Sequence, residues 1–115
     1  MTKVFISQPM NGRSDEEILK ERMEIFEKYE KTFGDAELID SFIKTHEEIS
    51  KGRIYMLGTS IALMHDADVV IFAPKYLTAK GCKIEHMVAK EYKMKVKYYS
   101  KVLDRFFNND LFDSM

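Results

Sequence analysis

The sequence has few of the features that mark secreted, membrane-spanning or polyanion-binding proteins. Its one cysteine, Cys82, excludes an internal disulfide framework and fits a reducing compartment. Its 18 basic and 19 acidic residues give a formal net charge of −1, which leaves no bulk field to attract polyanions. The apolar run near the first residue is too short for a signal peptide or a spanning helix. We therefore expect a cytoplasmic location, with neither a membrane nor a nucleic acid polymer as partner.

Common cofactor and metal motifs are also missing. The segment Gln8–Ser14 is neither a P-loop nor the dinucleotide glycine fingerprint, which argues against NTPase and oxidoreductase functions. The three histidines, His46, His65 and His86, lie far apart without ligand spacing. We therefore expect no cofactor and no metal. No repeat or low-complexity segment interrupts the 115 residues, a length that suits one domain with a substantial core.

Short apolar runs alternate with amphipathic stretches along the chain. Strands are predicted over residues 4–7, 37–39, 67–73 and 96–99, and helices from Ser14 to Gly34, from Arg53, and from Gly81 to about Lys93. The continuous run ADVVIFA is typical of a central strand covered on both faces. This alternation predicts an α/β fold, a doubly wound, Rossmann-like parallel sheet of four to five strands with helices on both faces.

The predicted helices differ in how clearly their ends and buried faces can be read. Ser14, three residues before Glu17, predicts a capping box at the first helix. The apolar stripes expected to face the core are Ile18, Ile25, Tyr29 and Phe33 in the first helix and Ile54, Leu57, Ile61 and Met64 in the second, where Gly58 permits close packing. Residues 40–52 have no firm periodicity and hold either a loop or an extra turn of helix. The apolar tail, residues 104–115, is expected to dock on this subunit or on a neighbour.

Ligands of such sheets bind beyond the carboxyl ends of the strands, and this rule selects the candidate residues. The eligible positions are residues 8–14, Asp40, Ser41 and residues 75–85. Asp66 and Asp68 precede the central strand, so we expect them at the opposite edge, in structural roles.

Glu85 is the most unusual of the eligible residues. A helical wheel places it on the apolar side with Ile84, Met87, Val88 and Tyr92, away from the polar stripe of Lys83, His86, Lys90 and Lys93. Desolvation there would raise its pKa, and a carboxylate in the second turn of this helix can face a ligand. A glutamate at the edge of the stripe can equally be paired with a lysine. Glu91 also lies near the apolar side, without such a placement.

The segment Gln8–Ser14 joins a strand to a helix whose free amide groups favour an anion. Gly12 lets the backbone approach a ligand, Arg13 can contact a phosphate with two donors, and Ser14 offers a hydroxyl. An ordinary strand-to-helix turn with a good cap explains the same residues. A nucleophilic Cys82 activated by His86 is a weaker alternative than a small first-turn residue near an exposed histidine.

Three stretches together resemble the nucleoside 2-deoxyribosyltransferase-like superfamily, which includes deoxyribosyltransferases and nucleotide N-glycosidases. They are KVFISQPMNGRSDEE, HDADVVIFAP and GCKIEHMVAKEY. The resemblance follows the family order over about residues 3–99 and is closest to an uncharacterised branch common in phage and bacterial genomes. It implies a single domain of this kind over residues 1–115.

The resemblance also implies roles for particular residues. The step from Gly81 to Glu85 is similar to the family's glycine-to-glutamate step, so Glu85 takes the position of the nucleophile. Residues 11–14 fall where nucleotide-hydrolysing members hold the 5′-phosphate. The substrate-binding residues expected on this basis are Ser7, Gln8, Met10, Asn11, Gly12, Arg13, Ser14, Thr78 and Gly81.

Two positions depart from the family pattern. Ser60 stands where the family often has the aspartate that helps the base to leave, and Ala79 stands where an aspartate or serine commonly precedes the glutamate. A serine cannot act as a carboxylic acid at neutral pH. Asp40, Tyr76 or a residue from another subunit then substitutes for it, or the chain has kept the pocket and lost much of the rate.

The resemblance therefore predicts cleavage or transfer of the N-glycosidic bond of a nucleoside 5′-monophosphate or a deoxynucleoside through Glu85. The family's glutamate attacks the anomeric carbon, the base leaves, and water or a second base resolves the glycosyl-enzyme. The alternative is a nucleotide-binding or sequestering protein of the same fold with little or no catalysis. The expected partner is a small-molecule nucleotide or nucleoside. Because the family commonly assembles, we also expect a homo-oligomer.

Overall fold

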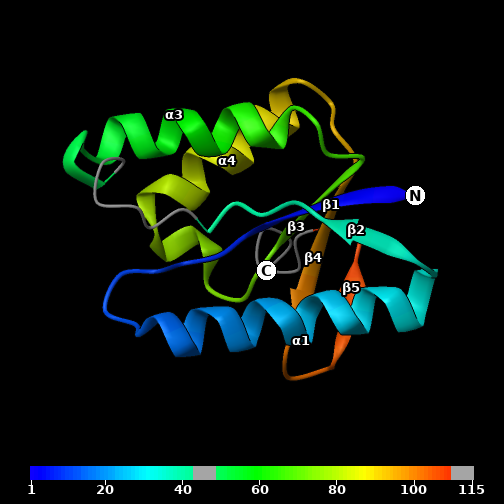
Figure 1. Cartoon of the computed structure of the whole chain (residues 1–115). Helices are drawn as coiled ribbons and strands as arrows, with labels where there is room; N and C mark the ends of the chain where they lie inside the picture. Colours follow the sequence, from blue (N-terminus) through cyan, green and yellow to red (C-terminus); the bar gives the residue numbers. More distant parts are fainter. Residues whose placement is uncertain (43–48, 110–115) are drawn as a thin grey trace.

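The computed structural model describes residues 1–42 and 49–109. Its elements are β1 (Thr2–Ser7), α1 (Asp15–Phe33), β2 (Ala36–Leu38), α3 (Arg53–Met64), β3 (Val69–Phe72), the 3₁₀ helix η1 (Tyr76–Thr78), α4 (Lys80–Glu91), β4 (Val96–Ser100) and β5 (Arg105–Phe107). The sheet forms the middle layer, with α1 on one face and α3 and α4 on the other (Figure 1). The predicted α/β fold with helices on both faces is confirmed.

The strand order in the sheet is β2-β1-β3-β4-β5, and the first four strands run parallel. β3 occupies the centre, as its continuous β-branched run predicts. From β1 the chain proceeds to β2 on one side, whereas from β3 it proceeds to β4 on the other side. The order therefore reverses between β1 and β3, and ligands of open α/β sheets bind at the carboxyl edge beside such a reversal.

The first helix begins and ends where the sequence indicates. Ser14 is the N-cap of α1, and its Oγ accepts a hydrogen bond of 3.1 Å from the backbone N–H of Glu17. The acidic residues in the first turn interact favourably with the positive end of the helix dipole. Gly34 stops the helix with φ of 103°, a backbone conformation that favours glycine. These local signals fix the turn that follows β1.

The core has two sides because successive strand residues point to opposite faces. Val4 and Ile6 of β1 pack on the α1 side with Ile25 and Tyr29. The other side is filled by Phe5, Met64, Val70, Phe72, Cys82 and Ala89, among others, from the sheet, α3 and α4. Ser7, the last residue of β1, alternates with Ile6 and faces α4. Asp68 lies at the opposite edge, as predicted, where its Oδ2 accepts a hydrogen bond of 2.7 Å from the N–H of Lys3.

The predicted buried face of α4 is wrong apart from Glu85 and Val88. Ile84, Met87 and Tyr92 are 39%, 66% and 77% exposed, whereas Cys82, Glu85 and Ala89 are buried. His86, expected in solvent, packs against the rings of Phe72 and Tyr98. The small side chains of Cys82 and Ala89 face the sheet and leave the bulky apolar side chains outside.

The predicted stripe of α3 is also only partly correct. Met64 is buried and Leu57 and Ile61 are half-buried, but Ile54 is 89% exposed. A Cβ added at Gly58 would meet no atom within 4 Å, so the close packing predicted at Gly58 does not occur. Close approach occurs at Gly81 of α4 instead, where an added Cβ would lie 3.9 Å from Leu57 Cδ1.

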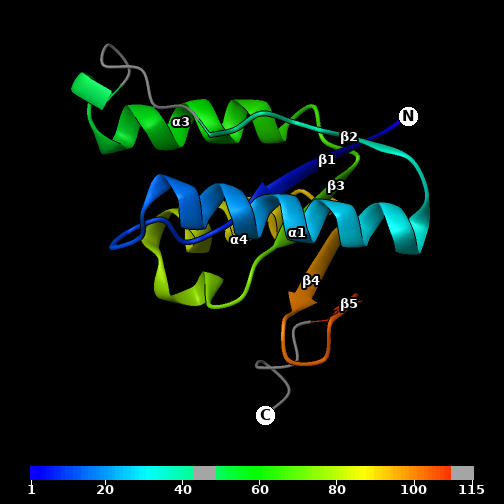
Figure 2. The ribbon, with the colours of Figure 1, turned by 60° about the horizontal axis from the view of Figure 1, so that its bottom comes forward.

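Part of the apolar tail pairs with the sheet. β5 runs antiparallel to β4 at the sheet edge, and the two strands lie side by side in Figure 2. Phe106 of β5 contacts Tyr29, Phe33 and Tyr99, with ring centroids 5.2 to 5.9 Å apart. The end of the tail, residues 110–115, and residues 43–48 of the unassigned stretch lie outside the described residues. No helix within the described ranges has the length and apolar content to cross a bilayer.

Candidate functional site

Glu85 lies in the second turn of α4 and turns its carboxyl group into the protein, where 6% of the residue is exposed. Its Oε1 accepts a hydrogen bond of 2.7 Å from Ser7 Oγ, at the carboxyl end of β1. Its Oε2 accepts a hydrogen bond of 2.5 Å from Ser60 Oγ on α3. Three elements distant in sequence therefore meet around one carboxyl group, beside the reversal of the strand order. The predicted inward orientation of Glu85 is confirmed.

The surroundings of Glu85 have opposing effects on its charge. Burial raises the pKa of Glu85, while the hydroxyls of Ser60 and Ser7 and the positive charge of Arg22 lower it part of the way. The pKa remains above its ordinary value. Both oxygens are held by hydroxyl donors, so the carboxyl group has a fixed orientation. A carboxylate fixed in this way can attack an electrophilic carbon or accept hydrogen bonds from a ligand.

Arg22 of α1 is a buried residue that the sequence prediction missed, with 3% of its surface exposed. Its Nε donates 2.7 Å to Gln8 Oε1, and its Nη1 donates 2.9 Å to Ser41 Oγ. The third nitrogen, Nη2, is buried and has no hydrogen-bond partner among the described residues. The available signal was position, because Arg22 lies four residues after Ile18 and three before Ile25, both in the buried stripe.

Gln8 connects Arg22 to the turn after β1. Its Nε2 donates 3.0 Å to the carbonyl of Ile18 and 2.9 Å to Glu21 Oε1. The same carboxylate oxygen accepts 3.0 Å from Arg13 Nη1. Hydrogen bonds therefore connect Arg13, Glu21, Gln8, Arg22 and Ser41 in series. This series links the predicted phosphate-binding turn to the segment after β2.

The turn itself has the backbone form expected of a tight strand-to-helix connection. Gly12 has φ of 75°, and the N–H of Arg13 donates 3.3 Å to the carbonyl of Met10. Asn11 and Gly12 are exposed. The Ser14 hydroxyl serves as helix cap, and Arg13 Nη1 also donates 2.9 Å to the carbonyl of Pro9. Ser14 and part of Arg13 therefore have structural partners.

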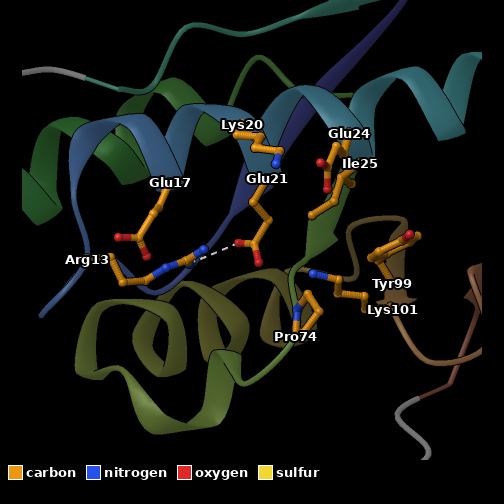
Figure 3. A pocket seen from close by; sticks show the side chains of 9 residues that line it. All are labelled: Arg13, Glu17, Lys20, Glu21, Glu24, Ile25, Pro74, Tyr99 and Lys101. Carbon is orange, nitrogen blue, oxygen red and sulfur yellow. Dashed lines mark hydrogen bonds and ion pairs between the residues drawn. The ribbon is translucent and has the colours of Figure 1, made fainter.

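A groove of about 220 Å³ lies on the α1 side of the same sheet edge (Figure 3). It is lined by Arg13, Glu17, Lys20, Glu21, Glu24, Ile25, Pro74, Tyr99 and Lys101. In Figure 3 the Arg13 guanidinium points to Glu21 along the ion pair, with Lys101 and Pro74 across the groove. Glu85 does not line this groove. Since the lining charges are of both signs and neutralise one another, we place the candidate site at Glu85.

The other predicted residues lie at varying distances from this centre. Tyr76 is buried among aromatic rings, and its ring centroid lies 5.1 Å from that of Phe72. Asp40 is exposed, and its Oδ1 accepts 3.2 Å from the N–H of Phe42. Thr78 is exposed, and its hydroxyl donates 2.6 Å to the carbonyl of Lys75. The structure thus brings Ser7 and Ser60 directly onto Glu85, and connects Gln8 through Arg22.

Cys82 lies near the centre but is unsuited to nucleophilic chemistry. Burial raises the pKa of the Cys82 thiol to about 11, which disfavours the thiolate at neutral pH. The Nε2 atom of His86 lies 2.7 Å from Tyr98 Oη. Helix position therefore does not activate this thiol. Within the described ranges, no group of three His, Cys, Asp or Glu side chains could hold a metal ion.

The reversed strand order and the buried carboxyl group beside it define an α/β protein with a polar site at the carboxyl edge of its sheet. The chain belongs to the family described as "Domain of unknown function (DUF4406)", whose model matches residues 2–98. No curated protein and no solved structure matches the chain. Membership of this family leaves the resemblance to the deoxyribosyltransferase-like superfamily a prediction.

Proposed function

We propose that the protein cleaves or transfers the N-glycosidic bond of a nucleoside 5′-monophosphate or deoxynucleoside, with Glu85 as the nucleophile. The observation that carries this proposal is the buried Glu85 carboxyl group at the carboxyl edge, held by Ser7 and Ser60. The resemblance of GCKIEHMVAKEY to the deoxyribosyltransferase-like superfamily supplies the chemistry.

The proposed reaction has two steps. The Glu85 carboxylate bonds to the anomeric carbon while the bond from that carbon to the base nitrogen breaks, and the electron pair leaves with the base. The base takes a proton from water. In hydrolysis the resulting hydroxide then attacks the anomeric carbon and releases Glu85 as carboxylate. In transfer a second base attacks instead, also releases Glu85 as carboxylate, and gives its N–H proton to the hydroxide. Ser7 and Ser60 orient the carboxylate for the first step.

The test is release of free base from a panel of nucleoside 5′-monophosphates and deoxynucleosides, measured by liquid chromatography. Glu85→Gln should abolish the release, because an amide oxygen is a poor nucleophile. Glu91→Gln is the matched control, since Glu91 is an exposed glutamate at the end of the same helix. We expect it to leave the rate unchanged.

A covalent intermediate gives an independent readout. Rapid acid quenching followed by mass spectrometry should find a peptide containing Glu85 with the mass of the sugar or sugar phosphate added. Base release that continues at the original rate in the Glu85→Gln variant would refute the assignment.

A second candidate function is binding or sequestration of a nucleotide with little turnover. It is favoured by Ser60, whose hydroxyl contacts Glu85 at the position where the family often places an acid. Titration calorimetry distinguishes the two functions. Tight binding with the ligand recovered intact supports the second, whereas failure of all nucleotides to bind at millimolar concentration counts against both.

A further inference from the structure

The buried guanidinium of Arg22 has donor capacity that the described protein does not use. Gln8 and Ser41 hold Nε and Nη1, and these two hydrogen bonds fix the plane of the guanidinium. Nη2 is buried without a partner among the described residues. Buried donors in folded proteins are nearly always hydrogen-bonded, so this N–H group is suited to bind a ligand, an ion or a water.

The charge of Arg22 indicates which kind of ligand would suit this nitrogen. Its hydrogen-bond acceptors, Gln8 and Ser41, are both neutral. The ion pairs within 4.0 Å found in the described ranges are Arg13–Glu21 and Lys28–Asp104, so no such carboxylate lies on Arg22. Asp40 and Glu85 act on its charge only from a distance. A buried cation is costly without a close counter-ion, and an anionic oxygen would supply one.

Arg13, the arginine that the sequence favours for phosphate, is placed differently. Its guanidinium already has an anionic partner in Glu21 and a carbonyl partner in Pro9. It lines the groove on the α1 side, whereas Glu85 is held on the other face of the sheet. The positive charge of Arg22, by contrast, acts across this distance on Glu85 and lowers the pKa of that carboxyl group.

We propose that Arg22 binds the phosphate of the ligand through Nη2 and so acts as a specificity-determining residue of the site. The inference deepens the proposed function, on which the identity of the phosphate as that of a nucleotide rests. The guanidinium carbon lies 5.9 Å from the centre of the half-buried Phe42 ring, and Nη2 is out of contact with solvent.

The test uses ribose 5-phosphate and ribose, neither of which has an N-glycosidic bond to cleave. Calorimetry on the whole chain should show that ribose 5-phosphate binds more tightly than ribose. Arg22→Gln should weaken the binding of ribose 5-phosphate by about 10- to 100-fold, as expected for the loss of a charge-assisted hydrogen bond, and leave the binding of ribose unchanged. Arg13→Gln is the matched control and should weaken ribose 5-phosphate much less.

Because Arg22 is buried, its replacement can also unfold the chain. Arg22→Lys keeps the charge, and thermal unfolding without ligand reports whether either variant folds. A measurement that needs no variant is a crystal structure of the natural chain with ribose 5-phosphate, in which a phosphate oxygen should lie within hydrogen-bond distance of Nη2.

Three results would overturn the inference: no measurable binding of ribose 5-phosphate, an equal preference over ribose in the folded Arg22→Gln variant, or an ordered water as the sole partner of Nη2. The outcome is separable from that of the proposed function. If base release requires Glu85 but the affinity for ribose 5-phosphate does not depend on Arg22, only this inference is removed. Phosphate binding that requires Arg22 without any base release removes only the glycosidase proposal.

Discussion

At Glu85, the energetic cost of burying a carboxyl group is only partly offset by its two hydroxyl donors. Burial raises the pKa of Glu85 above its value in the unfolded chain. A raised pKa in the folded state contributes stability that is fully present below the unfolded pKa. That contribution is lost as the pH rises through the folded pKa. The ionised Glu85 therefore destabilises the fold at neutral pH.

Glu85→Gln should accordingly stabilise the protein at pH 7. We expect the free energy of unfolding to rise, because glutamine, like the protonated carboxyl group, avoids the cost of burying a negative charge. The serine hydroxyls can rotate to donate to or accept from the new amide. The difference should disappear at about pH 3, where the unfolded carboxyl group is also protonated. Urea denaturation at both pH values measures it.

Glu91→Gln serves as the control for this experiment and should change stability at neither pH, because Glu91 is exposed. A Glu85→Gln variant that is less stable than the natural chain at pH 7 would show that the ionised carboxylate is stabilised by its partners. The pKa of Glu85 would then have to lie below its ordinary value.

The two central residues of the site differ in how far the sequence could predict them. The burial of Glu85 could be predicted because its position on the helical wheel and its place after the central strand agreed. Its role as the nucleophile, which the family resemblance implies, stays a prediction. Arg22 could not be identified as readily, because its partners Gln8 and Ser41 come from elements that only the folded sheet brings together. An arginine within an apolar stripe was the one available clue.

At the scale of elements, the alternation of apolar runs was sufficient to predict the order of strands and helices and the central place of β3. The buried face of α4 was not predictable in the same way. Hydrophobicity favoured Ile84 and Met87, but the buried side of α4 carries the small residues Cys82 and Ala89. β5 has three residues, too few for a pattern, and depends on pairing with β4.

β5 should matter for stability through Phe106, which joins Tyr29 and Phe33 of α1 to Tyr99 of β4. Phe106→Ala should lower the free energy of unfolding by about 2 kcal/mol, less than for a fully buried phenylalanine because Phe106 is half-buried. Thermal or urea unfolding measures the loss. Val102→Ala, in the same hairpin at 94% exposure, is the control and should have almost no effect. Equal effects of the two changes would contradict a structural role for β5.

At the scale of the whole molecule, several apolar side chains remain on the surface. Ile54 and Met87 are 89% and 66% exposed on α3 and α4, which share one face of the sheet. Exposed apolar groups of this kind often mark contacts between proteins. They suit the expected homo-oligomer, which stays a prediction.

Light scattering tests this assembly directly. We expect a mass that is a multiple of the 13.5 kDa of one chain. Dilution should reduce the mass toward that of one chain if the contact is reversible. A mass of one chain at every concentration, from micromolar to millimolar, would remove the oligomer prediction.

The amide of Gln8 has a consequence for the chemical ageing of the protein. Its nitrogen faces two acceptors, the Ile18 carbonyl and Glu21, while its oxygen faces the donor Arg22. Deamidation would replace that nitrogen with an oxygen and set it against both acceptors. A loss of ammonia at this one side chain would thus strengthen the contact with Arg22 and repel the Glu21 carboxylate that holds Arg13.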